Sequence, residues 1–321
     1  MSDPVQENPE CLDLTNSHLP NLDTVTLNAN LKLLDLTANR LETVDLRILA
    51  LEGLQTINFR QNLLTDVSCW SSCSSKGVLE DMEFRDNQLT EIPSLSGFTS
   101  LRRIEFSYNQ IRSIASLSEL QGTSGLEELY VASNKVTEMV GISHFTQLRV
   151  LELGSNRIRK IENLEGLVNL EQLWLGSNRI THIEGLLSLT KLRKMSVQSN
   201  RLDHISGLEN CCALEELYLS HNGILKIEGL ATLSQLNILD LSNNRICKVE
   251  GLESQAILED LWLNHNLIPS LDGIEEGLSP VLGALTTIYL EENPAVKDKA
   301  SYKAKMKEVV PKLKQLDADN V

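Results

Sequence analysis

The residues that could carry chemistry in this sequence are scattered cysteines and histidines. Cys69 and Cys73 have a spacing that zinc sites tolerate, yet no second Cys or His pair follows nearby. We therefore predict a solvent-facing loop there and no metal site. His221 and His265 occupy equivalent positions two repeats apart, about 10 Å if each repeat adds one strand. That separation is too large for one zinc ion, whose bonds to histidine are about 2.0–2.1 Å long.

Catalytic motifs are absent as well. No Gly-rich phosphate loop, H-E-x-x-H or G-x-S-x-G occurs in the chain. Arg60, Arg85 and Arg103 cluster on neighbouring repeats and could act on a phosphoryl group held by a partner. Internal ion pairing is the simpler interpretation, because Asp81, Glu83 and Glu105 lie beside them. We predict a protein that is not an enzyme and has no cofactor.

A repeat of twenty-two residues positions all of these side chains. Successive copies read LRVLELGSNRIRKIENLEGLVN from Leu148, LEQLWLGSNRITHIEGLLSLTK from Leu170 and LEELYLSHNGILKIEGLATLSQ from Leu214. Their common pattern, L-x-x-L-x-L-x-x-N-x-[LIV], is the signature of leucine-rich repeats, in which each copy supplies one short strand and a return segment. The Leu and Ile residues point inward, because one turn cannot bury its apolar face alone.

The asparagine of the pattern marks successive turns. A short amide side chain at a strand end can hydrogen-bond backbone groups that leave the sheet, so stacked turns form what we call the asparagine ladder. Its members are Asn39, Asn62, Asn87, Asn109, Asn134, Asn156, Asn178, Asn200, Asn222, Asn244, Asn266 and Asn293, with Ser17 in the same position of a degenerate first turn. Longer steps between some members predict Ser- and Gly-rich loops at 69–76, 121–125 and 276–283.

These features predict an α/β fold, a right-handed horseshoe-shaped solenoid of about 12–13 repeats with a parallel sheet on its concave face. Apolar spacings of three and four in the second half of each turn predict a short helix or 3₁₀ segment. We expect one solenoid over 11–293, preceded by a disordered acidic segment at 1–10 and followed by a C-terminal cap at 294–321. Apolar positions that can close the core there are Tyr302, Met306, Val309, Val310, Leu313 and Leu316.

The formal charge of −15 at pH 7 is unevenly spread. Seven lysines from Lys297 to Lys314 accompany two acidic residues, so this tail carries +5 and the remainder −20. Such an acidic body should repel nucleic acid and anionic membranes and attract basic protein surfaces. No apolar run approaches the length of a membrane span. The polar first ten residues and the unclustered pattern of the six cysteines favour a reducing intracellular compartment.

The residue between the last two leucines of L-x-x-L-x-L points away from the core, because side chains alternate along a strand. We call these residues the concave row: Asp13, Asp35, Asn58, Glu83, Glu105, Tyr130, Glu152, Trp174, Ser196, Tyr218, Asp240, Trp262 and Tyr289. The row is acidic early and aromatic late, and Asp260 lies on the same face. Exposed rings flanked by carboxylates are typical of protein-binding hot spots. No packing rule requires these side chains, so we predict that the row binds a protein.

The order LGSNRI, QSNRL, LSHNGI, followed by IYLEENPAVKDKASYKAKMKEVVPKLKQLDA, resembles the leucine-rich-repeat regulatory subunits of type-1 protein phosphatase from about Leu31 onward. The resemblance implies a non-catalytic regulator that holds the phosphatase catalytic subunit on its concave face, often with a second small inhibitor subunit, in nucleus and cytoplasm. Carried over position by position, the partner-binding residues are Glu105, Tyr130, Glu152, Trp174, Asp240, Asp260, Trp262 and Tyr289. The concave row adds Tyr218 to this set.

Two other functions fit the same sequence. The chain could be an intracellular leucine-rich-repeat adaptor for another protein, or it could supply an arginine to a nucleotide hydrolase as an activating cofactor. Neither alternative involves a nucleic acid or a membrane as partner.

Overall fold

The computed structural model describes residues 10–120 and 125–320, which form two compact units of stacked turns. Unit 1 is Met1–Asn156 and unit 2 is Arg157–Val321. The boundary follows a ladder asparagine and falls within the segment for which one solenoid is predicted. Residues 1–9 of the predicted disordered segment and 121–124 of the second predicted loop lie outside the described residues.

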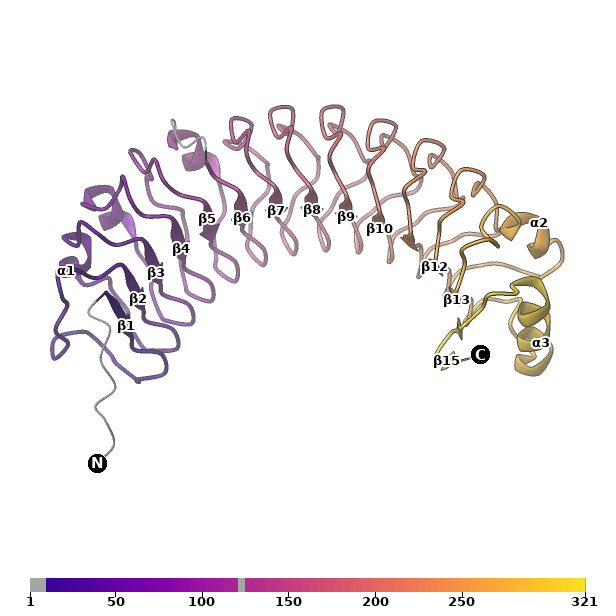
Figure 1. The fold of residues 1–321 in the computed structure, drawn as a ribbon, viewed down its shortest axis with the longest axis horizontal. Coiled ribbons are helices and arrows are strands. Elements are labelled where there is room, and N and C mark those ends of the chain that lie inside the picture. Colours follow the sequence, from indigo (N-terminus) through magenta and orange to yellow (C-terminus); the bar gives the residue numbers. More distant parts are fainter. Residues whose placement is uncertain (1–9, 121–124, 321) are drawn as a thin grey trace. The chain divides into compact units, whose positions relative to one another are not determined.

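Unit 1 is built on parallel strands of three residues that pair in sequence order (Figure 1). Helix α1 (Leu46–Leu49) and the 3₁₀ helices η1 (Ser68–Ser72) and η2 (Ala115–Glu119) lie between some of them. The strands are β1 (Cys11–Asp13), β2 (Leu33–Asp35), β3 (Thr56–Asn58), β4 (Asp81–Glu83), β5 (Arg103–Glu105), β6 (Glu128–Tyr130) and β7 (Val150–Glu152).

Unit 2 repeats this arrangement and ends in a helix followed by two short strands. Its strands are β8 (Gln172–Trp174), β9 (Lys194–Ser196), β10 (Glu216–Tyr218), β11 (Ile238–Asp240), β12 (Asp260–Trp262), β13 (Thr287–Tyr289), β14 (Gln315–Leu316) and β15 (Asp319–Asn320). All pair in parallel except β15, which is antiparallel to β14. Helix α2 (Ile274–Leu278) precedes β13, and α3 (Lys299–Val309) follows it.

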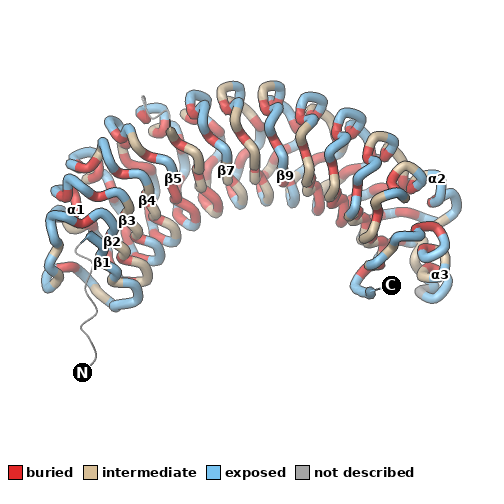
Figure 2. Tube along the Cα trace, in the orientation of Figure 1, coloured by how far each residue is buried: buried red, intermediate tan, exposed pale blue. Residues whose placement is uncertain are grey.

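The strands occur where the repeat predicts them. Each residue of the concave row is the last residue of its strand, and neighbouring members of the row pair in register within each unit. The middle residue of each strand from β2 to β13 is buried, while its neighbours on the other face are mostly partly exposed (Figure 2). The period-two alternation expected of a strand therefore persists although each strand has only three residues.

The asparagine ladder closes each turn as predicted. Asn244 is 7% exposed and donates its side-chain amide to the carbonyls of Leu219, Leu241 and Ser242 at 3.0–3.1 Å. Its Oδ1 accepts from the backbone N–H of Ile224 at 3.0 Å. One side chain thus bonds backbone groups of two successive turns and supplies the acceptor for the buried N–H of Ile224.

The residue before each ladder asparagine takes a left-handed backbone conformation. His221 and His265 both have φ of 54°, and Asn243 between them has the same value. Asn, Asp and His are enriched among residues with positive φ. The interpretation of these two histidines as polar residues at strand exits, without a metal, agrees with this backbone role.

The prediction of a helical return segment is wrong for most turns. Isolated i→i+3 hydrogen bonds replace a helix, as at Leu167 N to Leu164 O (3.0 Å) and Leu170 N to Leu167 O (3.0 Å). Before such bends a glycine turns left-handed, for example Gly207 with φ of 75°. A Cβ there would lie 2.1 Å from the carbonyl oxygen of Ile183 in the preceding turn, so only glycine fits at this position. The apolar spacing therefore marks stacked bends in most turns.

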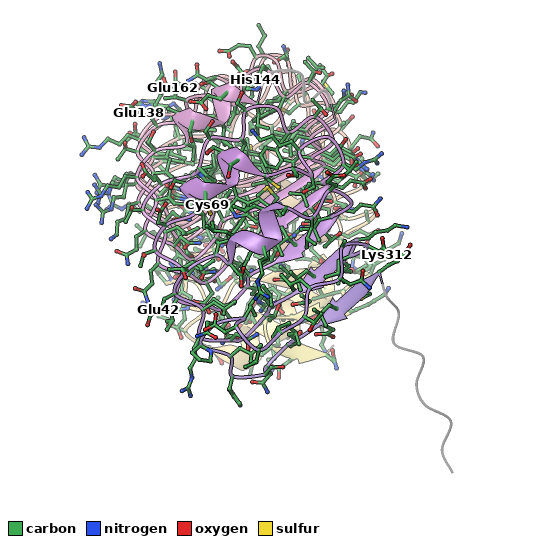
Figure 3. The ribbon with its side chains drawn as sticks, turned by 90° about the vertical axis from the view of Figure 1, so that its left-hand side faces the viewer. Glu42, Cys69, Glu138, His144, Glu162 and Lys312 are labelled. Atoms are coloured by element: carbon green, nitrogen blue, oxygen red, sulfur yellow. The ribbon has the colours of Figure 1, made fainter. Side chains whose placement is uncertain are left out.

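The predicted loop at 69–76 instead begins within η1 and contributes to the core. Trp70 is fully buried, and its ring lies edge-on to Phe59 (6.4 Å between centroids) and Phe84 (6.0 Å). Cys73 is only 5% exposed, with Sγ 3.1 Å from the Ser75 hydroxyl, so the prediction of a solvent-facing loop is wrong here. Cys69 lies in the helical segment itself (Figure 3). A Trp inside a Ser-rich insertion was the signal for this packing.

The predicted loop at 276–283 also begins in a helix, because α2 continues to Leu278. Ile274 and Leu278 of this helix are buried. The Ser- and Gly-rich composition therefore describes only the end of this insertion.

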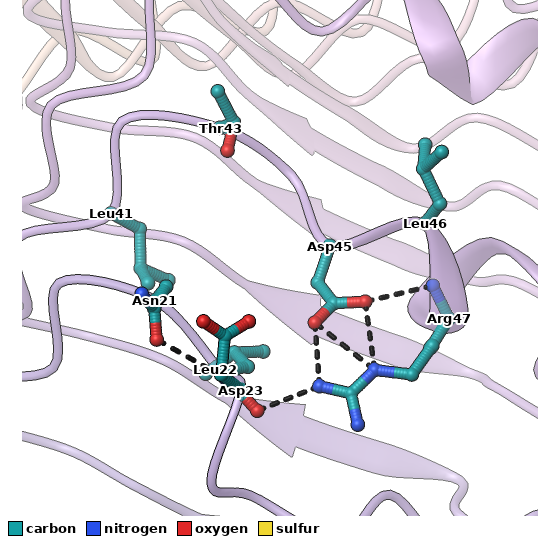
Figure 4. Close-up of a pocket in the computed structure, with 8 residues that line it drawn as sticks. All are labelled: Asn21, Leu22, Asp23, Leu41, Thr43, Asp45, Leu46 and Arg47. Carbon is teal, nitrogen blue, oxygen red and sulfur yellow. Dashed lines mark hydrogen bonds and ion pairs between the residues drawn. The ribbon is translucent and has the colours of Figure 1, made fainter.

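Polar contacts also join neighbouring turns outside the strands. Arg47 donates to the carbonyls of Leu22 (2.6 Å) and Val25 (3.1 Å), and Asp45 holds its guanidinium (Figure 4). Farther along, one position before the strands, Arg193 pairs with Glu215 of the next turn at 2.7 Å. Such pairs hold successive turns in register.

The C-terminal residues cover the end of the unit 2 core. Asp298 caps α3 by accepting from the backbone N–H of Ala300 at 3.1 Å. Asp317 accepts from the backbone N–H groups of Leu290 (2.7 Å) and Glu291 (3.0 Å). The buried apolar residues of this segment are Tyr302, Met306, Val309, Val310 and Leu316, whereas Leu313 is partly exposed.

Replacing one ladder amide should destabilise the fold strongly. Asn244→Ala removes four hydrogen bonds, worth about 0.5–1.5 kcal/mol each, and leaves the buried N–H of Ile224 without a partner. We expect the free energy of unfolding in urea to fall by more than about 2 kcal/mol. Asn264→Ala removes an amide on the next turn whose side chain forms no hydrogen bond with the described residues, so it should cost less than about 0.5 kcal/mol. Equal losses for the two variants would contradict this role of the ladder.

Candidate functional site

Four aromatic side chains of unit 2 form a continuous surface on the sheet. We call Trp174, Tyr218, Trp262 and Tyr289 the aromatic strip. Trp174 and Tyr218 stack with ring centroids 6.3 Å apart, and Tyr218 meets Trp262 edge-on at 6.4 Å. Trp262 and Tyr289 are 5.8 Å apart. All four rings are partly exposed, so the strip offers both rigid shape and accessible apolar area.

Small residues between the large ones allow these ring contacts. Trp174 and Tyr218 come from β8 and β10, about 10 Å apart along the sheet, with Ser196 of β9 between them. Their rings close the gap above Ser196, which is only 4% exposed. Asp240 has the same exposed fraction, 4%, between Tyr218 and Trp262. Large and small residues therefore alternate along the concave row from Trp174 to Trp262, whereas Trp262 and Tyr289 lie on adjacent strands.

Residues two positions earlier on the same face orient the rings. Trp174 Nε1 donates to Gln172 Oε1 at 3.2 Å, and the Tyr218 hydroxyl donates to Glu216 Oε2 at 2.9 Å. Burial, together with this bond to Glu216, raises the pKa of Tyr218 to about 12. The Tyr289 hydroxyl accepts from Gln315. Trp262 differs, because Asp260 is shorter and the buried Nε1 of Trp262 has no hydrogen-bond partner among the described residues.

Acidic members of the concave row have a structural role that the sequence analysis missed. Asp240 Oδ1 accepts from the backbone N–H of Ser242 (2.9 Å) and from its hydroxyl (2.6 Å). Glu105 Oε1 accepts from the backbone N–H of Ser107 at 2.6 Å, and Glu105 is 4% exposed. The statement that no packing rule requires the row is thus wrong for these two residues. A carboxylate two residues before a backbone N–H is a recognised turn signal.

In unit 1 the row passes through an ion cluster centred on Arg103. Its guanidinium lies 2.8 Å from Glu83, 3.1 Å from Asp81 and 3.5 Å from Glu105. Burial alone lowers the pKa of Arg103, but Asp81 and Glu83 outweigh that effect and raise it. The predicted internal ion pairing is confirmed for this arginine. Arg85 instead lies over the Tyr108 ring at 4.6 Å.

Tyr130 and Glu152 complete the predicted site residues of unit 1. The Tyr130 hydroxyl donates to Glu128 at 2.9 Å, and the Arg103 guanidinium lies 5.3 Å from the Tyr130 ring centroid. Glu152 is partly exposed, and burial raises its pKa while Arg85 opposes the rise. Tyr130 therefore repeats the ring-to-carboxylate bond of Tyr218.

The predicted site residues gather in two groups. Glu105, Tyr130 and Glu152 belong to unit 1, and the strip residues with Asp240 and Asp260 belong to unit 2. Sequence reasoning missed Ser196, Gln172 and Glu216, which shape and orient the strip. The recurring tripeptide Glu-Leu-Tyr at 128–130 and 216–218 was a signal for the orienting carboxylates.

The described residues contain no group of three or more His, Cys, Asp or Glu arranged to hold a metal ion. Across 10–120 and 125–320, no helix is long and apolar enough to cross a membrane.

The repeat pattern and the stacked turns define a leucine-rich-repeat protein. Sequence models described as leucine-rich repeats match residues 124–180 and 146–202, and a model of two such copies matches 212–254. An internalin (InlF) from Listeria monocytogenes is structurally similar, with a TM-score of 0.82 and 22% identity over 97% of this chain and 87% of that one. A leucine-rich-repeat protein from Leptospira interrogans is also similar, with a TM-score of 0.72 and 22% identity over 90% of this chain and 79% of that one. The predicted fold class is confirmed.

A protein of Arabidopsis thaliana is similar over a shorter segment. It is described as a homologue of the protein phosphatase 1 regulatory inhibitor subunit PPP1R7, and it is 46% identical to this chain over 95 residues. The matched segment covers 28% of this chain and 28% of the plant protein.

The pKa of Glu105 gives a pH-dependent prediction. Burial raises this pKa, with the bonds to Ser107 opposing the rise, so the charged form destabilises the folded state and the protonated form does not. Glu105→Gln should therefore raise the free energy of unfolding at pH 7, and the gain should shrink as the pH falls toward about 4, where the wild-type carboxyl is also protonated. Urea unfolding at both pH values measures this. The exposed Glu42→Gln is the control; a gain at Glu105 that does not change with pH would refute the argument.

Proposed function

We propose that this chain is a non-catalytic regulatory subunit that binds the catalytic subunit of type-1 protein phosphatase, in nucleus and cytoplasm. The observation that carries the proposal is the aromatic strip of unit 2. Four partly exposed rings, each in contact with its neighbour and three of them held by side-chain hydrogen bonds, form a surface that loses little conformational freedom when a partner binds. A second small inhibitor subunit would join the complex.

The contact residues in this proposal are the exposed members of the two groups. Trp174, Tyr218, Trp262 and Tyr289 would supply apolar area, and Asp260 and Glu152 would supply charge. In unit 1, Tyr130 would supply a further ring. Glu105 and Asp240 would position neighbouring residues of the site and would not contact the partner directly, because their carboxylates already accept hydrogen bonds within the chain.

Two further findings support the choice of partner. The plant relative is described as a phosphatase 1 regulatory inhibitor subunit homologue, and 46% identity over 95 residues is substantial for the matched segment. The carboxylates of the concave face fit a basic protein surface by charge. Supply of an arginine to a nucleotide hydrolase is disfavoured, because Arg103 is held by carboxylates of its own unit.

Trp174→Ala and Trp262→Ala should each weaken binding of the purified phosphatase catalytic subunit by more than about 1 kcal/mol, roughly fivefold or more in Kd. Calorimetric titration measures the affinity, and urea unfolding checks that each variant stays folded. Trp174→Ala loses one ring contact and Trp262→Ala loses two. Each lost contact should lower the free energy of unfolding by only about 0.5–1.5 kcal/mol beyond the lost burial.

Tyr108→Ala is the matched control. Tyr108 is 50% exposed and lies outside the concave row, so its removal should leave phosphatase affinity unchanged. The proposal fails if the wild-type chain forms no complex at micromolar concentrations. The assignment of the strip fails if both tryptophan variants bind as the wild type does.

A further inference from the structure

Positive charge concentrates on a second surface of unit 2, beyond the ends of its strands. We call this surface the exit edge, defined as the six residues that follow each of the five ladder asparagines from Asn156 to Asn244: 157–162, 179–184, 201–206, 223–228 and 245–250. It contains eight Arg or Lys residues and five Asp or Glu, in a chain with 29 bases and 44 acids overall. The exit edge is therefore basic on an acidic protein.

Arginines recur at the first position of this edge. We call Arg157, Arg179, Arg201 and Arg245 the arginine column; Gly223 occupies the intervening turn. The backbone N–H groups of Arg179 and Arg201 donate to the preceding turn at 2.8 Å, to Ile158 O and Ile180 O. Arg245 does the same to Ile224 O at 2.9 Å. Each arginine thus starts from a fixed backbone position, about 4.8 Å from the next turn.

The guanidinium groups of this column are not neutralised. None of the four forms an ion pair or a side-chain hydrogen bond with the described part of the chain, and three of them are exposed while Arg179 is partly exposed. Other bases of the edge do have partners: Lys248 lies 3.0 Å from Glu250, and Lys160 lies 4.0 Å from Glu162. Glu162 projects outward at this edge (Figure 3). Unpaired arginines are unexpected where acidic residues are in excess.

A second column makes the edge continuous. His182 and His204, three positions farther along their turns, have ring centroids 5.5 Å apart. Equivalent side chains on neighbouring turns therefore reach each other, and the edge presents one surface across several turns. Asp203 forms a side-chain hydrogen bond with His204, so its carboxylate does not pair with the arginine column.

We propose that the arginine column binds an extended acidic segment of a partner polypeptide. The guanidinium fork pairs with carboxylates in a bidentate geometry, which an ammonium group cannot match. Four turn spacings from Arg157 to Arg245 cover about 19 Å, and an extended chain advances about 3.3 Å per residue, so about six or seven residues match the column. This surface and its ligand are separate from the aromatic strip and its partner.

A polypeptide fits the edge better than a nucleic acid does. The exit edge contains no Trp, Tyr or Phe on which bases could stack. A chain of net charge −15 also repels the dense backbone charge of a nucleic acid more strongly than a short acidic peptide.

The test is binding of a fluorescein-labelled peptide of eight glutamates to the full chain, followed by fluorescence anisotropy at about 50 mM salt, where charge pairing is weakly screened. The wild type should bind, and the affinity should fall with added salt. The triple variant Arg179→Ala/Arg201→Ala/Arg245→Ala should bind at least tenfold more weakly. Lysine at the same three positions should give an intermediate affinity, because charge remains while the bidentate geometry is lost.

The matched control removes the same charge from paired positions. In Lys32→Ala/Arg102→Ala/Arg193→Ala, each lost base pairs with a glutamate in the wild type, so peptide affinity should stay within threefold. Trp262→Ala should also leave it unchanged, which separates this proposal from the phosphatase proposal. No binding by the wild type, equal losses in both triple variants, or tighter binding of an eight-residue oligothymidylate would each overturn it.

Discussion

A single asparagine amide at each strand exit is the contact on which the remaining structure depends. Its nitrogen donates to carbonyls of its own turn and of the preceding turn, as Asn244 does to Leu241 and Leu219. Its oxygen accepts from a backbone N–H of the preceding turn, which for Asn244 is that of Ile224. Because every turn is closed in the same way, strands of three residues suffice to build a sheet. The chain must turn sharply where it leaves the sheet. For this reason the residue before each ladder asparagine, and the glycine at many bends, adopts a left-handed conformation.

Because the core sets the turn spacing, the outward side chains can vary without a change in the core. The two units carry different side chains at these positions. In unit 2, alternation of rings with Ser196 and Asp240 lets aromatic residues two turns apart touch. In unit 1, the same positions carry carboxylates that surround Arg103. On the exit edge, the same spacing places an unpaired arginine at the equivalent position of four turns. One repeat thus provides apolar, ion-paired and basic surfaces without a change in the core.

Most of the fold could be predicted because its rules are local and repeated. The pattern located the strands, the ladder and the outward residues one by one. The failures occurred where a contact joins different turns: Trp70 packs into the core from an insertion, and at Gly207 the preceding turn lies so close that only glycine fits at the bend. The burial of Glu105 and Asp240 was missed for a related reason, because their exposure depends on the rings and turns around them. The aromatic positions could be predicted, whereas the contact between rings two turns apart required coordinates.

The most direct test of the account is hydroxyl-radical footprinting of the chain, free and mixed with the phosphatase catalytic subunit, read by mass spectrometry at single residues. We predict that Trp174, Tyr218, Trp262 and Tyr289 lose reactivity together in the complex while exposed Tyr108 stays reactive. Strip residues that react equally with and without the phosphatase, in a mixture where a complex is present, would contradict it.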